Sequence, residues 1–109
     1  MSDVYVLPTT GRVSHVGGME LVEFLPHVWG YTSLWSDGTL AIPVIQSDME
    51  RAGHGGRFLD SLPKDVRIAF PTVVSGILSG MLSRRGFRFE ENLIYAVELG
   101  EWVDGWVRP

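Results

Sequence analysis

The stretch ERAGHGGRFLDSL, residues 50–62, places three glycines and a histidine between two arginines, directly ahead of a short apolar segment. Gly53, Gly55 and Gly56 can adopt backbone angles that are closed to other residues, and they allow a ligand to approach the main chain closely. A helix that follows such a turn points its unpaired N–H groups and the positive end of its dipole at it. The sequence therefore predicts an anion-binding turn, although a glycine-rich turn also serves simply to connect a strand to a helix.

The composition indicates one domain with a packed core. The chain has 109 residues, of which 45% are hydrophobic and 11% aromatic, which argues against disorder. The formal charge of -4 argues against nucleic acid as a partner, although Arg51, Arg57, Arg84 and Arg85 leave local positive charge. The chain has no cysteine, which excludes disulfides, zinc–thiolate sites and thiol nucleophiles. Neither a long apolar run nor a basic-then-apolar leader is found, so we expect a cytoplasmic protein with no membrane partner.

The N-terminal part predicts little helix. Residues 4–7 indicate a short edge strand closed by Pro8, and residues 11–18 indicate a weak strand or a loop. Residues 19–25 have apolar side chains at 19, 21, 22, 24 and 25. This spacing fits a short helix that ends before Pro26 better than it fits a strand.

A hairpin is predicted next. Residues 28–35 and 39–45 are apolar, and Asp37-Gly38 between them is a strong turn signal. Pro43 cannot donate a hydrogen bond to a neighbouring strand, so it predicts a bulge or a departure of the second arm from its neighbour.

The remainder alternates between strands and helices. Residues 57–62 predict a helix that stops at Pro63, and residues 66–70 predict a strand, so the strand–helix–strand order favours parallel pairing. Residues 72–85 have the strongest helical pattern, with Gly86 as the C-terminal cap. The segments 87–99 and 102–107 predict a C-terminal hairpin around Gly100-Glu101. We therefore expect a mixed α/β domain.

Three of these features resemble the GNAT superfamily of N-acyltransferases, which use acyl-coenzyme A. Residues 53–62 resemble the family's GxGxxLLxxL pattern, and Arg84-Arg85-Gly86-Phe87 resembles its helix end with a basic residue and Gly-Phe. Residues 102–107, WVDGWV, resemble its closing xVDxxV strand. The resemblance covers residues 39–109. It implies a GNAT-like, strongly twisted, mostly antiparallel mixed sheet with a central parallel pair flanked by helices, and a shortened N-terminal part over residues 1–38.

The resemblance also implies a function, namely transfer of an acyl group from acetyl-coenzyme A directly to an amine on a small molecule or a protein. The amides of residues 51–56 would hold the pyrophosphate of coenzyme A, and the pantetheine arm would lie between the two parallel strands. Backbone N–H groups of Val44 or Ile45 would polarise the thioester carbonyl, and Ser75 would hydrogen-bond to pantetheine. The implied cofactor-binding residues are Val44, Ile45, Arg51, Ala52, Gly53, His54, Gly55, Gly56, Arg57 and Ser75.

The sequence departs from the family at two positions. Glu50 stands where the family has an arginine, and Leu82 stands where it often has a tyrosine that protonates the coenzyme A thiolate. Asp48 and Glu50 lie where a general base for the acceptor amine could stand, but they could equally be loop carboxylates that only contact solvent. No catalytic residue is therefore assigned. A second hypothesis is a catalytically inactive GNAT-fold protein that binds or assembles, for instance as a homo-oligomer, and a third is a site for another phosphorylated ligand such as a nucleotide.

The histidines and tryptophans leave further alternatives open. His54 could act as a base or bind phosphate, or simply cap the helix or face water. His15 and His27 are too isolated in sequence to form a metal site with each other, so we expect no metal. The tryptophans could line an acceptor pocket, form a subunit interface or pack in the core; they are Trp29, Trp35, Trp102 and Trp106.

Overall fold

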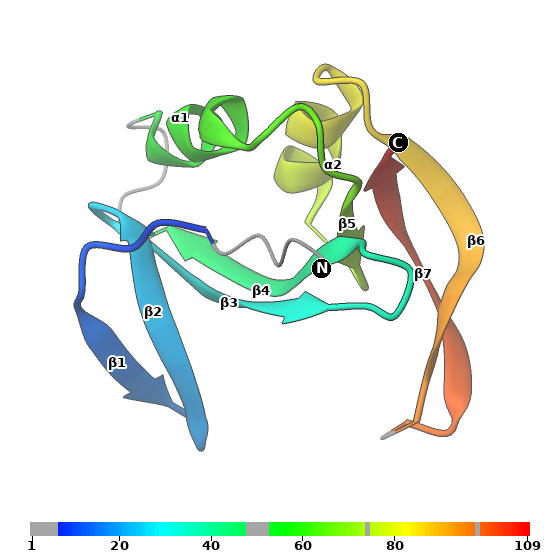
Figure 1. The fold of residues 1–109 in the computed structure, drawn as a ribbon, viewed down its shortest axis with the longest axis horizontal. Helices are drawn as coiled ribbons and strands as arrows, with labels where there is room; N and C mark the ends of the chain where they lie inside the picture. Colours follow the sequence, from blue (N-terminus) through cyan, green and yellow to red (C-terminus); the bar gives the residue numbers. More distant parts are fainter. Residues whose placement is uncertain (1–6, 48–52, 74, 98) are drawn as a thin grey trace.

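A computed structural model describes residues 7–47, 53–73, 75–97 and 99–109 and consists of one seven-stranded sheet with two short helices (Figure 1). The strands lie in the order β1-β2-β3-β4-β5-β7-β6. In chain order the elements are β1 Val13–Val16, β2 Met19–Leu25, β3 Val28–Leu34, β4 Leu40–Ser47, α1 His54–Ser61, β5 Ile68–Pro71, α2 Gly76–Ser83, β6 Arg88–Ala96 and β7 Glu101–Arg108. Within the described ranges, no helix is both long and apolar enough to cross a membrane.

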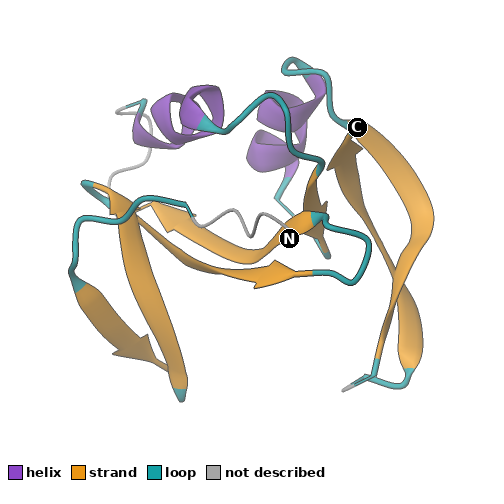
Figure 2. Ribbon diagram, viewed as in Figure 1, coloured by secondary structure: helices purple, strands orange, loops and turns teal. Residues whose placement is uncertain are grey.

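The expected fold class, an α/β GNAT-like domain with a central parallel pair flanked by helices, is wrong. Strands make up 49% and helices 17% of the described residues. Both helices are eight residues long and lie on the same side of the sheet, so they do not flank it (Figure 2). The fold is mostly sheet with a helical layer on one face.

The helix expected over residues 19–25 is also wrong, because this segment is strand β2. It pairs with β1 on one side, for example Leu21 with Ser14, and with β3 on the other. Two features hide the strand pattern in the sequence. Glu23 is a charged residue that is only 2% exposed, and the register shifts between Glu23 and Leu25, which disturbs the simple alternation of inward and outward side chains.

The predicted hairpin at Asp37-Gly38 is confirmed, since β3 and β4 pair antiparallel on either side of it. The predicted bulge at Pro43 is confirmed as well. Tyr31 is opposite Val44 and Ser33 is opposite Ala41, so two residues of β4 face one residue of β3 at this point.

The strands on either side of α1 pair in parallel, as the strand–helix–strand order predicted, but over a short distance. The paired positions of β4 and β5 are Leu40 with Ile68 and Ala41 with Ala69. The C-terminal hairpin is also confirmed, with β6 and β7 antiparallel.

The helices begin at other residues than the sequence predicted. Helix α1 starts at His54 and so includes two glycines that were expected in the preceding turn. Helix α2 starts at Gly76, four residues later than expected, and the Ser75 hydroxyl accepts a hydrogen bond from the Leu78 N–H at its N-terminus. Thr72, which was expected to be helical, has a left-handed φ of 58° at the end of β5.

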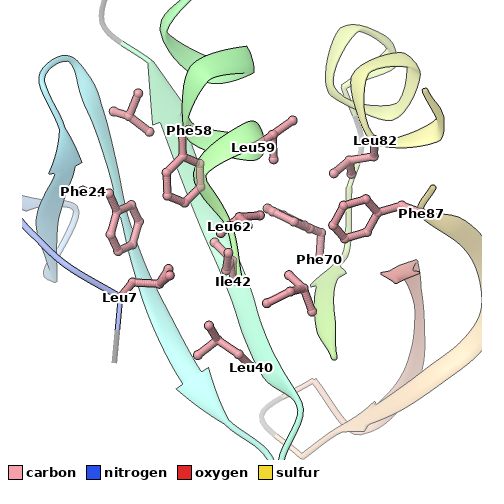
Figure 3. Close-up of a cluster of buried hydrophobic side chains, with 12 residues drawn as sticks. Leu7, Phe24, Leu40, Ile42, Phe58, Leu59, Leu62, Phe70, Leu82 and Phe87 are labelled. Carbon is pink, nitrogen blue, oxygen red and sulfur yellow. The ribbon is translucent and has the colours of Figure 1, made fainter. Parts of the chain in front are cut away.

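The core lies between the sheet and the two helices (Figure 3). Phe58 of α1 stacks on Phe24 of β2, with ring centroids 5.0 Å apart. Phe70 of β5 meets the edge of Phe87, which precedes β6, at 5.4 Å. Leu82 of α2 is completely buried beside them. This core fixes α1 and α2 over the central strands, where the candidate site lies.

Candidate functional site

The site begins where β4 and β5 separate. Beyond Ala41 and Ala69 the two strands no longer pair, and a cavity of about 210 Å³ lies between them. Its lining consists of the second half of β4, the end of β5 and the start of α2: Ile42, Pro43, Val44, Ile45, Gln46, Phe70, Pro71, Thr72, Val73, Ser75 and Leu78. Successive N–H groups of a strand point alternately to its two neighbours. Either Val44 or Ile45 therefore directs its amide toward this opening.

A larger groove adjoins the cavity, with a volume of about 820 Å³. It runs from the end of β4 across the start of α1 to α2, and its lining is Ile45, Gln46, Ser47, Gly53, His54, Gly55, Gly56, Ser75, Ile77, Leu78, Met81, Arg84 and Arg85. The cavity and the groove share Ile45, Gln46, Ser75 and Leu78. The two spaces thus form one path from the parted strands to the N-terminus of α1.

The glycines of α1 have two structural roles. Gly53 precedes the helix with φ at 80°, a conformation that side chains disfavour. Gly55 and Gly56 face α2, because a Cβ on them would lie 3.4 Å from the Met81 methyl and 3.2 Å from an Arg85 nitrogen. Gly53, at the N-cap position, provides no side-chain hydrogen bond to the first N–H groups of α1.

Positive charge on this path comes from the end of α2. The Arg85 Nε donates to Asp60 of α1 at 2.9 Å, and one of its terminal nitrogens donates to the Met81 carbonyl at 3.1 Å. Arg84 also lines the groove and is exposed. The sequence predicted positive charge at both residues but did not place them in the cofactor site, because nothing in the pattern shows that α2 lies beside α1.

His54 is held at the entrance to α1 by two neighbours. Its Nδ1 lies 2.6 Å from a guanidinium nitrogen of Arg57, and its ring lies 4.8 Å from that of His27. Burial lowers the pKa of His54, and the charges of Arg57 and His27 lower it further. The ring is therefore best suited to accept a hydrogen bond from Arg57 in its neutral form.

His27 is in turn positioned by a buried carboxylate. Glu23 accepts hydrogen bonds from the Thr10 hydroxyl at 2.6 Å, from Arg12 at 3.2 Å and from the His27 N–H at 3.2 Å. The Thr10 hydrogen bond lowers the pKa of Glu23. Burial raises this pKa, whereas the hydrogen bond from the His27 N–H and the positive charge of Arg12 lower it further. The sequence analysis did not identify this network, since it considered only the apolar residues of the segment 19–25.

The predicted site residues are distributed as follows. Val44 lines the cavity, Ile45 and Ser75 line both spaces, and Gly53, His54, Gly55 and Gly56 line the groove. The Arg57 side chain turns back to His54 and is not part of the groove lining. Arg51 and Ala52 lie outside the described residues, as do the possible bases Asp48 and Glu50.

Two further observations limit the chemistry of the site. Leu82, at the position expected to hold a tyrosine, is fully buried in the core and provides no proton donor. In the described part of the chain, no group of three or more His, Asp or Glu residues could hold a metal ion.

Neither a family model, nor a curated protein, nor a solved structure matches this chain.

Proposed function

We propose that this chain is an acyl-coenzyme A-dependent N-acyltransferase, with a glycine turn that resembles that of the GNAT enzymes on a different fold. The observation that carries the proposal is the path formed by the parted strands β4 and β5 and the groove beside α1. Small-molecule sites have volumes of roughly 300–1,000 Å³, and the groove, at about 820 Å³, falls in this range.

The chemistry along the path matches the parts of an acyl-coenzyme A. The cavity between the strands is small, about 210 Å³, and largely apolar, with Ile42, Phe70 and Leu78 in its lining, which suits a pantetheine arm. The groove ends at the N-terminus of α1, which Gly53 leaves without a side-chain cap of its own, and at Arg84. Backbone N–H groups and a guanidinium are the groups that bind phosphate, so the pyrophosphate would lie there.

The transfer itself would use the backbone of β4. An amide of Val44 or Ile45 that faces the opening is suited to stabilise the negative charge that develops on the thioester oxygen during attack by the amine. The amine would attack the thioester carbon directly and form a C–N bond. The C–S bond would break, coenzyme A would leave as its thiolate, and the proton lost by the amine would pass to the thiolate or to solvent. No side chain is assigned to proton transfer.

The test is stabilisation by the cofactor. Ligand that binds only the native state raises the free energy of unfolding by about 2.7 kcal/mol at a hundredfold excess over Kd. We expect millimolar acetyl-coenzyme A or coenzyme A to raise the thermal midpoint. Arg84→Ala should weaken binding about tenfold through loss of a charge-assisted hydrogen bond, whereas Arg88→Ala, which removes an exposed arginine outside the groove, should leave binding unchanged.

Two other outcomes would overturn the proposal. If coenzyme A gives no shift, the site does not bind it. If ATP shifts the midpoint and coenzyme A does not, the groove is a nucleotide site.

A second candidate function, binding of acyl-coenzyme A without catalysis, is favoured by Leu82. Its complete burial leaves the expected tyrosine position without a proton donor. Release of free thiol from acetyl-coenzyme A in the presence of an amine distinguishes the two functions. Binding without thiol release, across a set of primary amines, would support the second candidate.

A further inference from the structure

The C-terminal hairpin carries two aromatic pairs on one face. Trp102 of β7 meets Tyr95 of β6 with ring centroids 5.7 Å apart, and Trp106 of β7 meets Phe89 of β6 at 5.8 Å. Alternate residues of a strand point to the same face, so the two tryptophans share a face. Trp102 is 59% exposed, Phe89 51% and Tyr95 45%, whereas Trp106 is partly buried against the core.

A carboxylate stands between the two pairs. Asp104 lies midway between Trp102 and Trp106 on the same face of β7, about 7 Å along the strand from each. It is exposed, and it accepts a hydrogen bond from the Asn92 N–H at 2.8 Å, while its main-chain carbonyl accepts one from the Thr72 N–H at 2.8 Å. Asn92 and Thr72 both have left-handed backbone angles, with φ at 51° and 58°. Main-chain N–H groups of two residues in left-handed conformations therefore hold Asp104 in place.

The cations near this face point elsewhere. The guanidinium of Arg108 lies 5.2 Å over the ring of Phe87 and donates to the Pro63 carbonyl. Arg88 is opposite Val107, on the other face of the hairpin. Within the described part of the chain, no basic side chain forms an ion pair with Asp104. The carboxylate thus remains available between four aromatic rings.

We propose that the face formed by Phe89, Tyr95, Trp102, Asp104 and Trp106 binds a lysine-bearing peptide segment of a partner protein. A carboxylate attracts an ammonium group, and the faces of aromatic rings attract it further, most strongly that of tryptophan. Two exposed acids of β6, Glu90 and Glu91, add to the negative field.

The length and openness of the face favour a peptide. From Trp102 to Trp106 it extends about 14 Å along the strand, and three of its four rings are about half exposed, so it does not enclose a small cation. An extended basic peptide could place one ammonium at Asp104 and lay its methylene groups along both aromatic pairs. This inference is independent of acyl transfer, since it concerns binding to another surface.

The experiment is a titration of the full chain followed by NMR, with the indole N–H signals of Trp102 and Trp106 as reporters. An acetylated and amidated tetralysine should shift both signals, and its acetyl-lysine counterpart, which has no charge, should bind at least about tenfold more weakly. Asp104→Asn should lower the affinity for tetralysine about tenfold. This variant retains an oxygen that can accept from the Asn92 N–H, so it preserves the contact that holds β6 where its register shifts between Glu90 and Ile94.

The matched control is Glu101→Gln, which removes the same charge from the opposite face of β7 and should change the affinity less than twofold. An equal loss in both variants would show that only net charge matters and would overturn the proposal. So would unchanged Trp102 and Trp106 signals at millimolar tetralysine, or equal binding of the uncharged peptide. If spermidine binds as tightly as tetralysine, the face recognises free polyamines and the peptide assignment is wrong.

Discussion

The region beneath the groove and the C-terminal hairpin use aromatic pairs of similar geometry for different purposes. Phe24 and Phe58, which hold α1 against the sheet, have ring centroids 5.0 Å apart and are at most 4% exposed. Tyr95 and Trp102 on the hairpin are 5.7 Å apart and about half exposed. The first pair removes apolar area from water and so stabilises the fold. The second pair leaves that area available to a partner.

The two regions also differ in charge. The groove presents the N-terminus of α1 together with Arg84 and Arg85, and these groups attract anions. The hairpin face presents Asp104 between aromatic rings, and these groups attract cations. One sheet therefore carries two surfaces of opposite preference, a distinction that the net charge of -4 does not reveal.

The largest effect expected from this comparison is on stability. Phe58→Ala should lower the free energy of unfolding by about 3–5 kcal/mol, because it leaves a cavity beneath α1. Trp102→Ala should cost less than about 1 kcal/mol, because the indole is mostly in solvent. Urea unfolding of both variants measures the difference. Similar losses would mean that the hairpin aromatics form part of the core after all.

The sequence predicts the hairpins of this fold better than its helices. Asp37-Gly38 and Gly100-Glu101 specify turns through short-range backbone chemistry, and both hairpins are present. The prediction of a helix over residues 19–25 was wrong. Glu23 in this segment is buried, and its carboxylate accepts hydrogen bonds from Thr10 and Arg12, which are distant in sequence. The burial of a charged residue depends on such partners, and no local pattern reports them.

The sequence indicated the glycines of the candidate site but not the side chains that other elements bring to it. Glycines with special φ angles or close contacts can be recognised in a sequence, and Gly53, Gly55 and Gly56 do line the groove. The contribution of Arg84 depends on α2 lying beside α1, and the contact of His27 with His54 joins residues 27 positions apart. Such contacts arise only from the tertiary arrangement.

A smaller effect concerns acid, and it involves His54 at the groove and Glu23, whose carboxylate accepts from the His27 N–H. Folding lowers the pKa of His54, so the unfolded chain takes up this proton first. The free energy of unfolding should therefore fall as the pH drops below the ordinary histidine pKa of about 6.5. Folding also lowers the pKa of Glu23. The resulting contribution to the free energy of unfolding is present above the ordinary glutamate pKa of about 4.3 and is lost as the pH falls below it.

Urea unfolding at a series of pH values separates these two groups. His54→Gln should flatten the loss near pH 6 and leave the loss at lower pH, and Glu23→Gln should do the reverse, so each variant is the control for the other. If neither variant alters the profile, carboxylates elsewhere account for the sensitivity to acid.

The smallest expected effect concerns Thr72, which connects the two regions. It lines the cavity between β4 and β5, and its N–H donates to the carbonyl of Asp104 on the hairpin. A left-handed conformation costs a residue with a Cβ about 1–2 kcal/mol, and glycine loses about 0.5–1 kcal/mol more backbone entropy on folding. Thr72→Gly should therefore stabilise the fold by about 0.5–1 kcal/mol in urea unfolding, while Thr72→Ala, which keeps the Cβ, should not.

Binding of coenzyme A and tetralysine to the Thr72 variants then tests whether the left-handed conformation of this residue serves either surface. Strained residues persist where the surrounding structure fixes them, often beside functional sites. If Thr72→Gly gains stability but weakens binding of coenzyme A, of tetralysine or of both, the strained conformation positions that surface at a cost in stability. If Thr72→Gly lowers the stability instead, contacts of the threonine side chain outweigh the strain. In that case the connection between groove and hairpin contributes to the fold itself, and the two regions are less independent than their opposite charges imply.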